Sequence, residues 1–182
     1  MTGFMIAGSL HVIPLSPTDI GALARHPCLP KPNRSMTVFS FTDKQSVEIV
    51  IEIVISDGMR ECELPVLDLS PFHKLETLRI GNDCFENVNE MKLIGLTELS
   101  CIVIGENSFT RSKNGNDPNR CFLVKNCPSL TEMKIGSQSF SDYSVCEIEN
   151  TPALELIEMG GLKEWGGSFH AASLELKSIR IH

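Results

Sequence analysis

The sequence predicts a mainly β fold, a parallel solenoid of four to five coils with little helix, and three observations support this prediction. First, the pattern Leu75-x-x-Leu78-x-Ile80-Gly81-x-x-Cys84-Phe85 recurs at 99–109 and at 130–140. Second, these copies open 24 residues apart, as from Leu75 to Leu99, or 31 apart where the second copy carries a seven-residue insertion. Third, apolar residues alternate with period two, which is typical of strands rather than helices.

Each unit contains a second alternating segment, and its first apolar residue stands eight residues before the next opening residue. A coil of about 24 residues cannot bury its own apolar face, so neighbouring coils are expected to stack about 4.8 Å apart with parallel strands in register. The second segments are Leu67-x-Leu69, Met91-x-Leu93, Phe122-x-Val124 and Cys146-x-Ile148.

The residues between these segments predict the corners and the interior of each coil. Glycines are expected where the chain bends, and an Asn followed by a Pro two residues later is expected at the second corner. Four phenylalanines at equivalent places are expected to form one interior column. These positions are Gly81, Gly105, Gly136 and Gly160, then Asn126 and Asn150 with Pro128 and Pro152, and finally Phe85, Phe109, Phe140 and Phe169.

The ends of the array are less regular. Val50-x-x-Ile53-x-Ile55 predicts a degenerate earlier coil, and a fourth copy opens at Leu154 and reaches Ser168-Phe169 only after five extra residues. A fifth copy is expected to open as Leu176-x-x-Ile179-x-Ile181. This last strand carries no polar cap, so we expect either truncation from a longer array or end-to-end association of two chains.

Residues 1–46 form a separate N-terminal segment, which leaves 47–182 for the solenoid. Five prolines between positions 14 and 32 predict extended chain, with one short helix opening at 16–19 and a strand at 36–41. Two PxxP matches, at 14–17 and 27–30, allow a role as a ligand for peptide-binding domains. We favour a cap over the first coil, because an exposed solenoid end requires covering.

Composition narrows the function classes. A length of 182 residues predicts one domain, and the net charge of −7 argues against general binding to nucleic acid or to an anionic membrane. The seven cysteines are odd in number and form no CxxC, so neither a disulfide framework nor a zinc site is predicted. The first fifteen residues lack Lys and Arg and are too short to span a bilayer. We therefore expect a cytoplasmic protein, or a cell-surface one if a signal or anchor lies outside this chain.

From about residue 50 onward the pattern resembles the leucine-rich repeat superfamily, whose unit reads L-x-x-L-x-L-x-x-N-x-L. The ninth place holds Asp83, Asn107 and Gln138, the eleventh holds Phe, and the Ile-Gly-x-x-Ser-Phe element is most similar to BspA-type variants. The resemblance implies a right-handed solenoid and protein interaction, without shared chemistry. The strand pattern on the convex half suggests a two-sheet, β-helix-like cross-section in place of helices.

The candidate binding residues lie on the expected sheet face and on inserted loops. The residues at the fifth position of each unit form a row that carries charges of both signs. Such a row is typical of a polar protein-binding surface, and an ordinary solvated surface has the same composition. The insertion 110–120 is polar and is expected to protrude as a flexible loop, and the Gly-flanked Trp165 either packs back or anchors a partner. The face residues are Arg79, Val103, Lys134, Glu158 and Arg180 with Glu132 and Glu155, and the loop residues are Asn114 and Trp165.

Three functions remain open. The favoured one is a non-catalytic scaffold that binds one or more proteins, with no catalytic residue, metal or cofactor, no nucleic acid and no membrane span. The second is a structural piece that assembles through its coil ends. The third is a β-helix enzyme acting on a polymer, because Glu132, Glu155 and Glu158 could converge on the sheet face and stacked carboxylates can perform acid–base chemistry or hold calcium.

Overall fold

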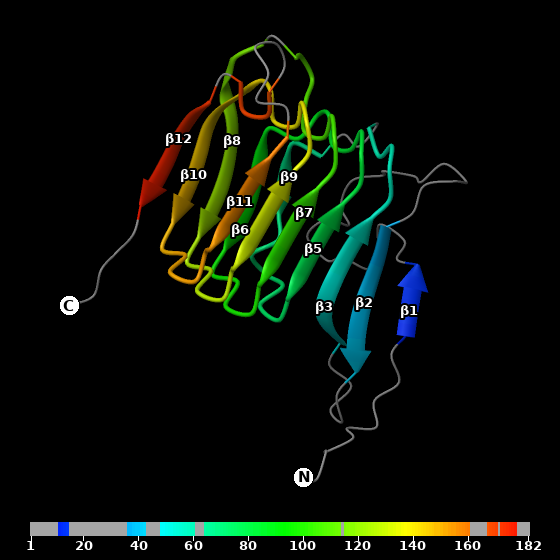
Figure 1. Ribbon diagram of the computed structural model, residues 1–182. Coiled ribbons are helices and arrows are strands. Elements are labelled where there is room, and N and C mark those ends of the chain that lie inside the picture. The colour runs from blue at the N-terminus through cyan, green and yellow to red at the C-terminus, as the bar shows by residue number, and fades with distance from the viewer. Residues whose placement is uncertain are drawn as a thin grey trace, which may run out of the picture.

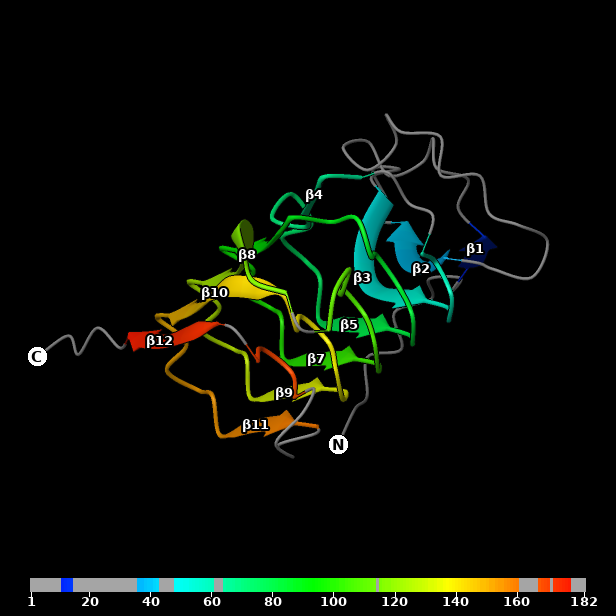
Figure 2. The same ribbon diagram turned by 90° about the horizontal axis from the view of Figure 1, so that it is seen from above.

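The computed structural model describes residues 11–14, 36–42, 48–60, 64–113, 115–160, 167–170 and 172–177. Within these ranges the chain is mainly β without helix, so none of the described residues form a helix able to cross a membrane. The strands build two sheets joined by corners, and each coil contributes one strand to each sheet (Figures 1 and 2). Five such strand pairs, from β3 with β4 to β11 with β12, make the predicted parallel β-solenoid.

Sheet A carries the first strand of every coil. Its order is β1-β2-β3-β5-β7-β9-β11, and the strands from β3 onward are parallel. Ile53, Leu78, Ile102, Met133 and Ile157 are Cα partners in one inward row, so the register predicted from the repeat is confirmed. The bounds are β1 (His11–Pro14), β2 (Met36–Thr42), β3 (Glu48–Ile55), β5 (Thr77–Ile80), β7 (Cys101–Ile104), β9 (Glu132–Ile135) and β11 (Leu156–Met159).

Sheet B carries the second strand of every coil, in the order β4-β6-β8-β10-β12, and all its pairings are parallel. Leu67, Met91, Phe122, Cys146 and Leu174 form one of its inward rows. The second strand of each coil gives the two-sheet cross-section that the alternation predicted. The bounds are β4 (Val66–Asp68), β6 (Glu90–Ile94), β8 (Asp117–Lys125), β10 (Tyr143–Glu149) and β12 (Ser173–Lys177).

The phenylalanine column is confirmed. Ring centroids of Phe85 and Phe109 lie 5.3 Å apart, those of Phe109 and Phe140 lie 4.6 Å apart, and those of Phe140 and Phe169 lie 4.8 Å apart. All four phenylalanines have φ between 53° and 56°, in the left-handed region that bulky residues rarely adopt. Stacking between neighbouring coils therefore stabilises, at each of these phenylalanines, a backbone conformation that is unfavourable in an isolated coil.

A ladder of hydroxyl groups explains why serine precedes three of these phenylalanines, at positions 108, 139 and 168. Ser108 Oγ donates to the Gly81 carbonyl at 2.8 Å and accepts from the Cys84 amide at 3.2 Å. Ser139 repeats the pattern, since its Oγ donates to the Gly105 carbonyl and accepts from the Ser108 amide. Each hydroxyl thus satisfies buried backbone groups of the preceding coil, which would otherwise cost about 1–3 kcal/mol each.

The corner glycines are required by close approach of neighbouring coils, not by a bend. None of Gly81, Gly105, Gly136 and Gly160 has positive φ. A Cβ added at Gly136 would lie 2.5 Å from the carbonyl carbon of Gly105, which no real Cβ tolerates. The predicted second corner is confirmed at Asn126 and Asn150, whose φ angles of 54° and 53° are left-handed.

The N-terminal strands extend sheet A. The predicted strand at 36–41 is confirmed as β2, which pairs antiparallel with β3, and β1 pairs antiparallel with β2. The expected helix at 16–19 and the PxxP stretch at 27–30 lie outside the described residues, as does most of the PxxP match at 14–17.

The prediction that Leu176 opens a fifth copy is wrong. Leu174 pairs with Cys146 and Leu176 pairs with Ile148, so both leucines belong to a sheet B strand. Leu176 is therefore equivalent to Val124 of β8 and not to an opening leucine such as Leu154. Leu176 ends the pattern Leu174-x-Leu176 and also begins the pattern Leu176-x-x-Ile179-x-Ile181. Both patterns alternate, so alternation alone does not indicate which of the two sheets the strand joins.

Candidate functional site

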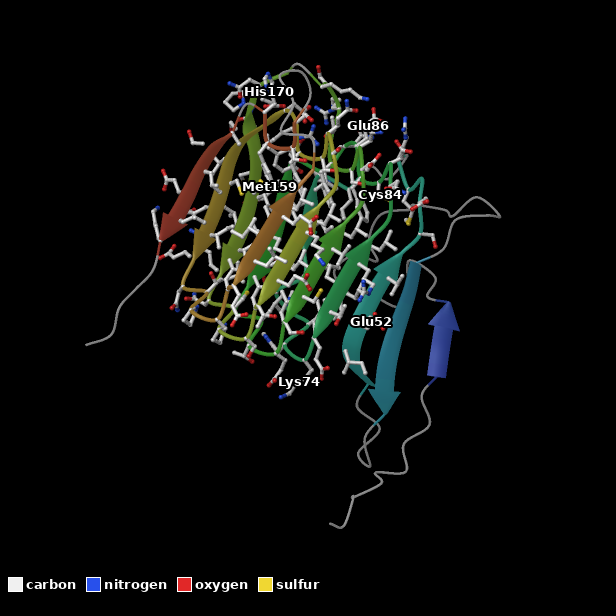
Figure 3. All side chains as sticks on the ribbon, in the orientation of Figure 1. Glu52, Lys74, Cys84, Glu86, Met159 and His170 are labelled. Carbon is white, nitrogen blue, oxygen red and sulfur yellow. The ribbon has the colours of Figure 1, made fainter. Side chains whose placement is uncertain are left out.

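The outward side of sheet A, called here the sheet A face, holds the predicted binding residues. Arg79 of β5, Val103 of β7, Lys134 of β9 and Glu158 of β11 are Cα partners in one row, as the repeat predicted. The neighbouring outward row contains Glu52, Thr77, Cys101, Glu132 and Leu156. The parallel register therefore gathers residues from five coils on one continuous surface (Figure 3).

Two pairs of opposite charges lie on the sheet A face. Arg79 Nε lies 3.5 Å from Glu52 Oε1, and Lys134 pairs with Glu132 of its own strand. The hydrogen bond that Lys134 donates to Glu132 raises the pKa of Lys134, with a smaller contribution from Glu158. Both cations stay accessible, with 52% of the Arg79 side chain and 43% of the Lys134 side chain exposed.

Glu132, Glu155 and Glu158, which the enzyme alternative would bring together, do not form a stack of carboxylates. The in-register neighbour of Glu132 on β11 is Leu156, and the neighbour of Glu158 on β9 is Lys134. Glu155 precedes β11 and lies beside an apolar groove at the C-terminal end of the solenoid. Lys134 therefore stands next to Glu132 along its strand and beside Glu158 across the sheet. No three His, Cys, Asp or Glu side chains in the described ranges are arranged to hold a metal ion.

The outward side of sheet B is a network of ion pairs. Lys125 Nζ lies 2.7 Å from Glu147 and 3.4 Å from Glu149, and Lys177 Nζ lies 2.8 Å from Glu147. The hydrogen bonds from Lys125 and Lys177 lower the pKa of the Glu147 carboxyl. Only 26% of the Lys125 side chain and 17% of the Glu147 side chain are exposed, whereas 52% of Lys177 on the last coil is exposed.

The insertion at 110–120 is anchored, contrary to the expectation of a freely protruding loop. Asp142 Oδ2 accepts hydrogen bonds from the Arg111 and Ser112 amides at 3.3 and 3.1 Å and from Arg120 Nη1 at 2.6 Å. Arg120, fully buried, donates to the carbonyls of Glu86, Val88 and Phe109. The insertion is therefore fixed to the core on both of its sides.

Tyr143 completes this buried network. Its ring lies 4.6 Å from the Arg120 guanidinium carbon, and its hydroxyl donates to the Val88 carbonyl at 2.7 Å. Burial raises the pKa of the Tyr143 hydroxyl, so it stays a neutral hydrogen-bond donor. Arg120 and its partners were not among the predicted residues, although the alternation Arg120-x-Phe122-x-Val124 indicates an inward side chain.

The C-terminal end of the solenoid exposes apolar side chains. The exposed large hydrophobic residues of the described ranges are Leu156, Leu174 and Leu176, all on the last coil, at 44%, 48% and 61%. A groove of about 380 Å³ opens between β11 and β12, and its walls are Ile148, Thr151, Pro152, Leu154, Glu155, Ile157, Leu176 and Lys177. This end is the second candidate binding surface.

The described cysteines are free thiols. Burial raises the pKa of Cys84 and Cys127, and raises that of Cys146 to about 12. A thiol with so high a pKa is a poor nucleophile and metal ligand, so these three side chains act as apolar core groups.

Three predicted binding residues, Asn114, Trp165 and Arg180, lie outside the described residues.

Fold and repeat together define the chain as a β-solenoid repeat protein whose coils pair in parallel within two sheets. No protein-family model, no curated protein and no solved structure matches it.

Proposed function

We propose that this chain is a non-catalytic repeat scaffold of leucine-rich-repeat type, which binds a partner protein on the sheet A face. The observation that carries the proposal is the in-register row of Arg79, Val103, Lys134 and Glu158, which four consecutive coils hold in place. A surface fixed by the core loses little conformational entropy on binding.

The chemistry of the sheet A face suits a protein partner. Its exposed charges are of both signs and lie beside Val103 and Leu156, which gives a polar, selective surface with apolar contacts. The pairs Arg79–Glu52 and Lys134–Glu132 are partly exposed, so exchanging them for charges of a partner costs little, on the order of 1 kcal/mol or less.

Reversing charge on this face is expected to weaken partner binding. The immobilised chain is used to capture partners, and the affinity of an identified partner is then measured for Arg79→Glu and Lys134→Glu. We expect a loss of about fivefold or more for each, equal to about 1 kcal/mol. The matched control is Lys92→Glu on sheet B, where Lys92 pairs with Glu90. Equal affinity for all three variants and the unchanged chain would refute binding on this face.

The exposed apolar end favours a second function, self-assembly through coil ends. Leu174 and Leu176 point to the interior row but are exposed, so a second copy could cover them. We expect the sedimentation coefficient to rise with concentration, and the double variant Leu174→Ser/Leu176→Ser to abolish the rise. Val103→Ser on the sheet A face serves as the control. A mass that stays monomeric at all concentrations would rule out this function.

A further inference from the structure

A second, differently charged cavity lies at the corner between the sheets, next to the insertion. This corner pocket has a volume of about 270 Å³ and is lined by Arg60, Glu86, Asn107, Thr110, Arg111 and Lys113. Glu86 marks this end of the strands in Figure 3, whereas Lys74 lies at the opposite end. Three cations and one carboxylate line its walls, and the carboxylates of Asp83 and Asp117 pair with two of these cations from outside the lining.

The cations of the corner pocket can be released to a ligand. Arg60 pairs with Asp83, with 52% and 35% of their side chains exposed, and Arg111 Nη1 lies 3.9 Å from Asp117 Oδ2. Exposed pairs of this kind contribute about 0–1 kcal/mol. Lys113 donates to Gln138 Oε1, so its partner in the described part of the chain is a neutral amide.

Asn107, a residue of the corner pocket wall, carries an acceptor in need of a donor. Its Oδ1 atom is buried and makes no hydrogen bond, whereas its backbone amide donates to the Ser137 carbonyl at 2.9 Å. A buried acceptor without a donor costs about 1–3 kcal/mol, and a ligand N–H that reaches it recovers this energy.

The anchored insertion sets the position of two of the cations. Asp142 holds the amides of Arg111 and Ser112, and Thr110 Oγ1 donates to the Gln138 carbonyl at 2.6 Å. Arg111 and Lys113 therefore start from backbone that the core already orders, which lowers the entropic cost of binding. The buried Arg120–Asp142 pair that anchors the insertion to the core therefore also orders one wall of the corner pocket.

We infer that the corner pocket binds an acidic segment of the partner protein, with an Asp or Glu carboxylate between Arg111 and Lys113 and a peptide N–H donating to Asn107 Oδ1. This inference rests on the proposed function and adds the chemistry of the partner. The Glu86 carboxylate limits the positive charge, so the corner pocket suits one or two carboxylates rather than a polyanion.

The test uses fluorescence anisotropy with the full chain and a labelled peptide of alternating Asp, Glu, Gly and Ser. A peptide of equal length with Asn and Gln in place of the acids is the matched control ligand. We expect the acidic peptide to bind more tightly, and Lys113→Ala to weaken it about fivefold. Asn107→Gly keeps the left-handed backbone, at φ 54°, and is expected to weaken binding about three- to tenfold.

Lys74→Ala is the matched control variant, because Lys74 is an exposed lysine paired with Glu98 at the opposite end of the strands. We expect it to bind the acidic peptide as the unchanged chain does. Equal binding of the acidic and amide peptides, or equal losses for Lys113→Ala and Lys74→Ala, would overturn the inference. Displacement of the acidic peptide by inorganic phosphate at equal concentration would also overturn it, by revealing a general oxyanion site.

These outcomes stay distinguishable from failure of the proposed function. If the corner pocket does not bind the acidic peptide but Arg79→Glu still weakens a captured partner, this inference fails and the proposed function stands. Thermal melting followed by circular dichroism checks that each variant folds. If Asn107→Gly does not fold, the affinity of Lys113→Ala for the acidic peptide tests the inference by itself.

Discussion

Phe140→Ala is expected to lower the free energy of unfolding by about 4 kcal/mol, among the largest effects of any single substitution in this chain. The Phe140 ring stacks on Phe109 and Phe169 with interplanar angles of 4° and 3°, and meets the Tyr143 ring edge-on at 4.9 Å. Alanine leaves a cavity that neighbouring coils cannot close, because the strand spacing fixes their separation. Urea denaturation followed by circular dichroism measures the loss.

Phe72→Ala is the control for this prediction. Phe72 is partly buried against the core but is not one of the stacked rings, so its truncation is expected to cost less than half as much. Equal losses for the two variants would show that stacking adds nothing to ordinary burial. A loss below about 1 kcal/mol for Phe140→Ala would contradict the role of the column as the shared interior of the coils.

Arg120→Met is expected to destabilise the chain by about 3–5 kcal/mol, because it leaves the Asp142 carboxylate buried without its cation. The two side chains are 0% and 5% exposed, and Nη1 and Oδ2 lie 2.6 Å apart. The carbonyls of Glu86 and Phe109 also lose their donor, and the Val88 carbonyl keeps only the Tyr143 hydroxyl. Denaturation midpoints give the loss, and hydrogen exchange at the Arg111 and Ser112 amides reports whether the insertion loosens.

The double variant Arg120→Met/Asp142→Leu distinguishes the loss of the ion pair from the change in side-chain size. It removes both buried charges, so we expect it to be more stable than Arg120→Met alone. Arg79→Met breaks the exposed pair with Glu52 and is expected to cost less than about 1 kcal/mol. If Arg120→Met costs no more than Arg79→Met, the buried pair does not anchor the insertion.

The repeating part of the fold could be predicted from sequence because each coil buries the side chains at the same positions of the repeat unit. Leu78, Ile102 and Met133 occupy one apolar position of the unit, and a parallel stack of equal coils allows only the register in which they coincide. The same reasoning predicted the phenylalanine column and the row on the sheet A face, since both follow from the period.

Other features depend on contacts between coils, which no period encodes. The close approach at Gly136 is visible only once Gly105 is placed beneath it. The corner pocket joins Arg60, Glu86 and Lys113 from three different turns of the chain, so no local motif connects them. Leu176 was misplaced because both sheets use alternating leucines, and the five extra residues of the preceding unit obscured the count.

The reversed strand at the N-terminal side gives sheet A a polarity. β2 runs antiparallel to β3 and occupies its outer edge, so the evenly slanted hydrogen-bond pattern of the parallel strands ends there. The outer edge of β11 still presents that parallel pattern, with β9 on its other side. Designers who wish to lengthen this solenoid should therefore duplicate a coil between β3 and β11 or graft one beyond β11, because a coil grafted before β3 would meet a strand of the wrong direction.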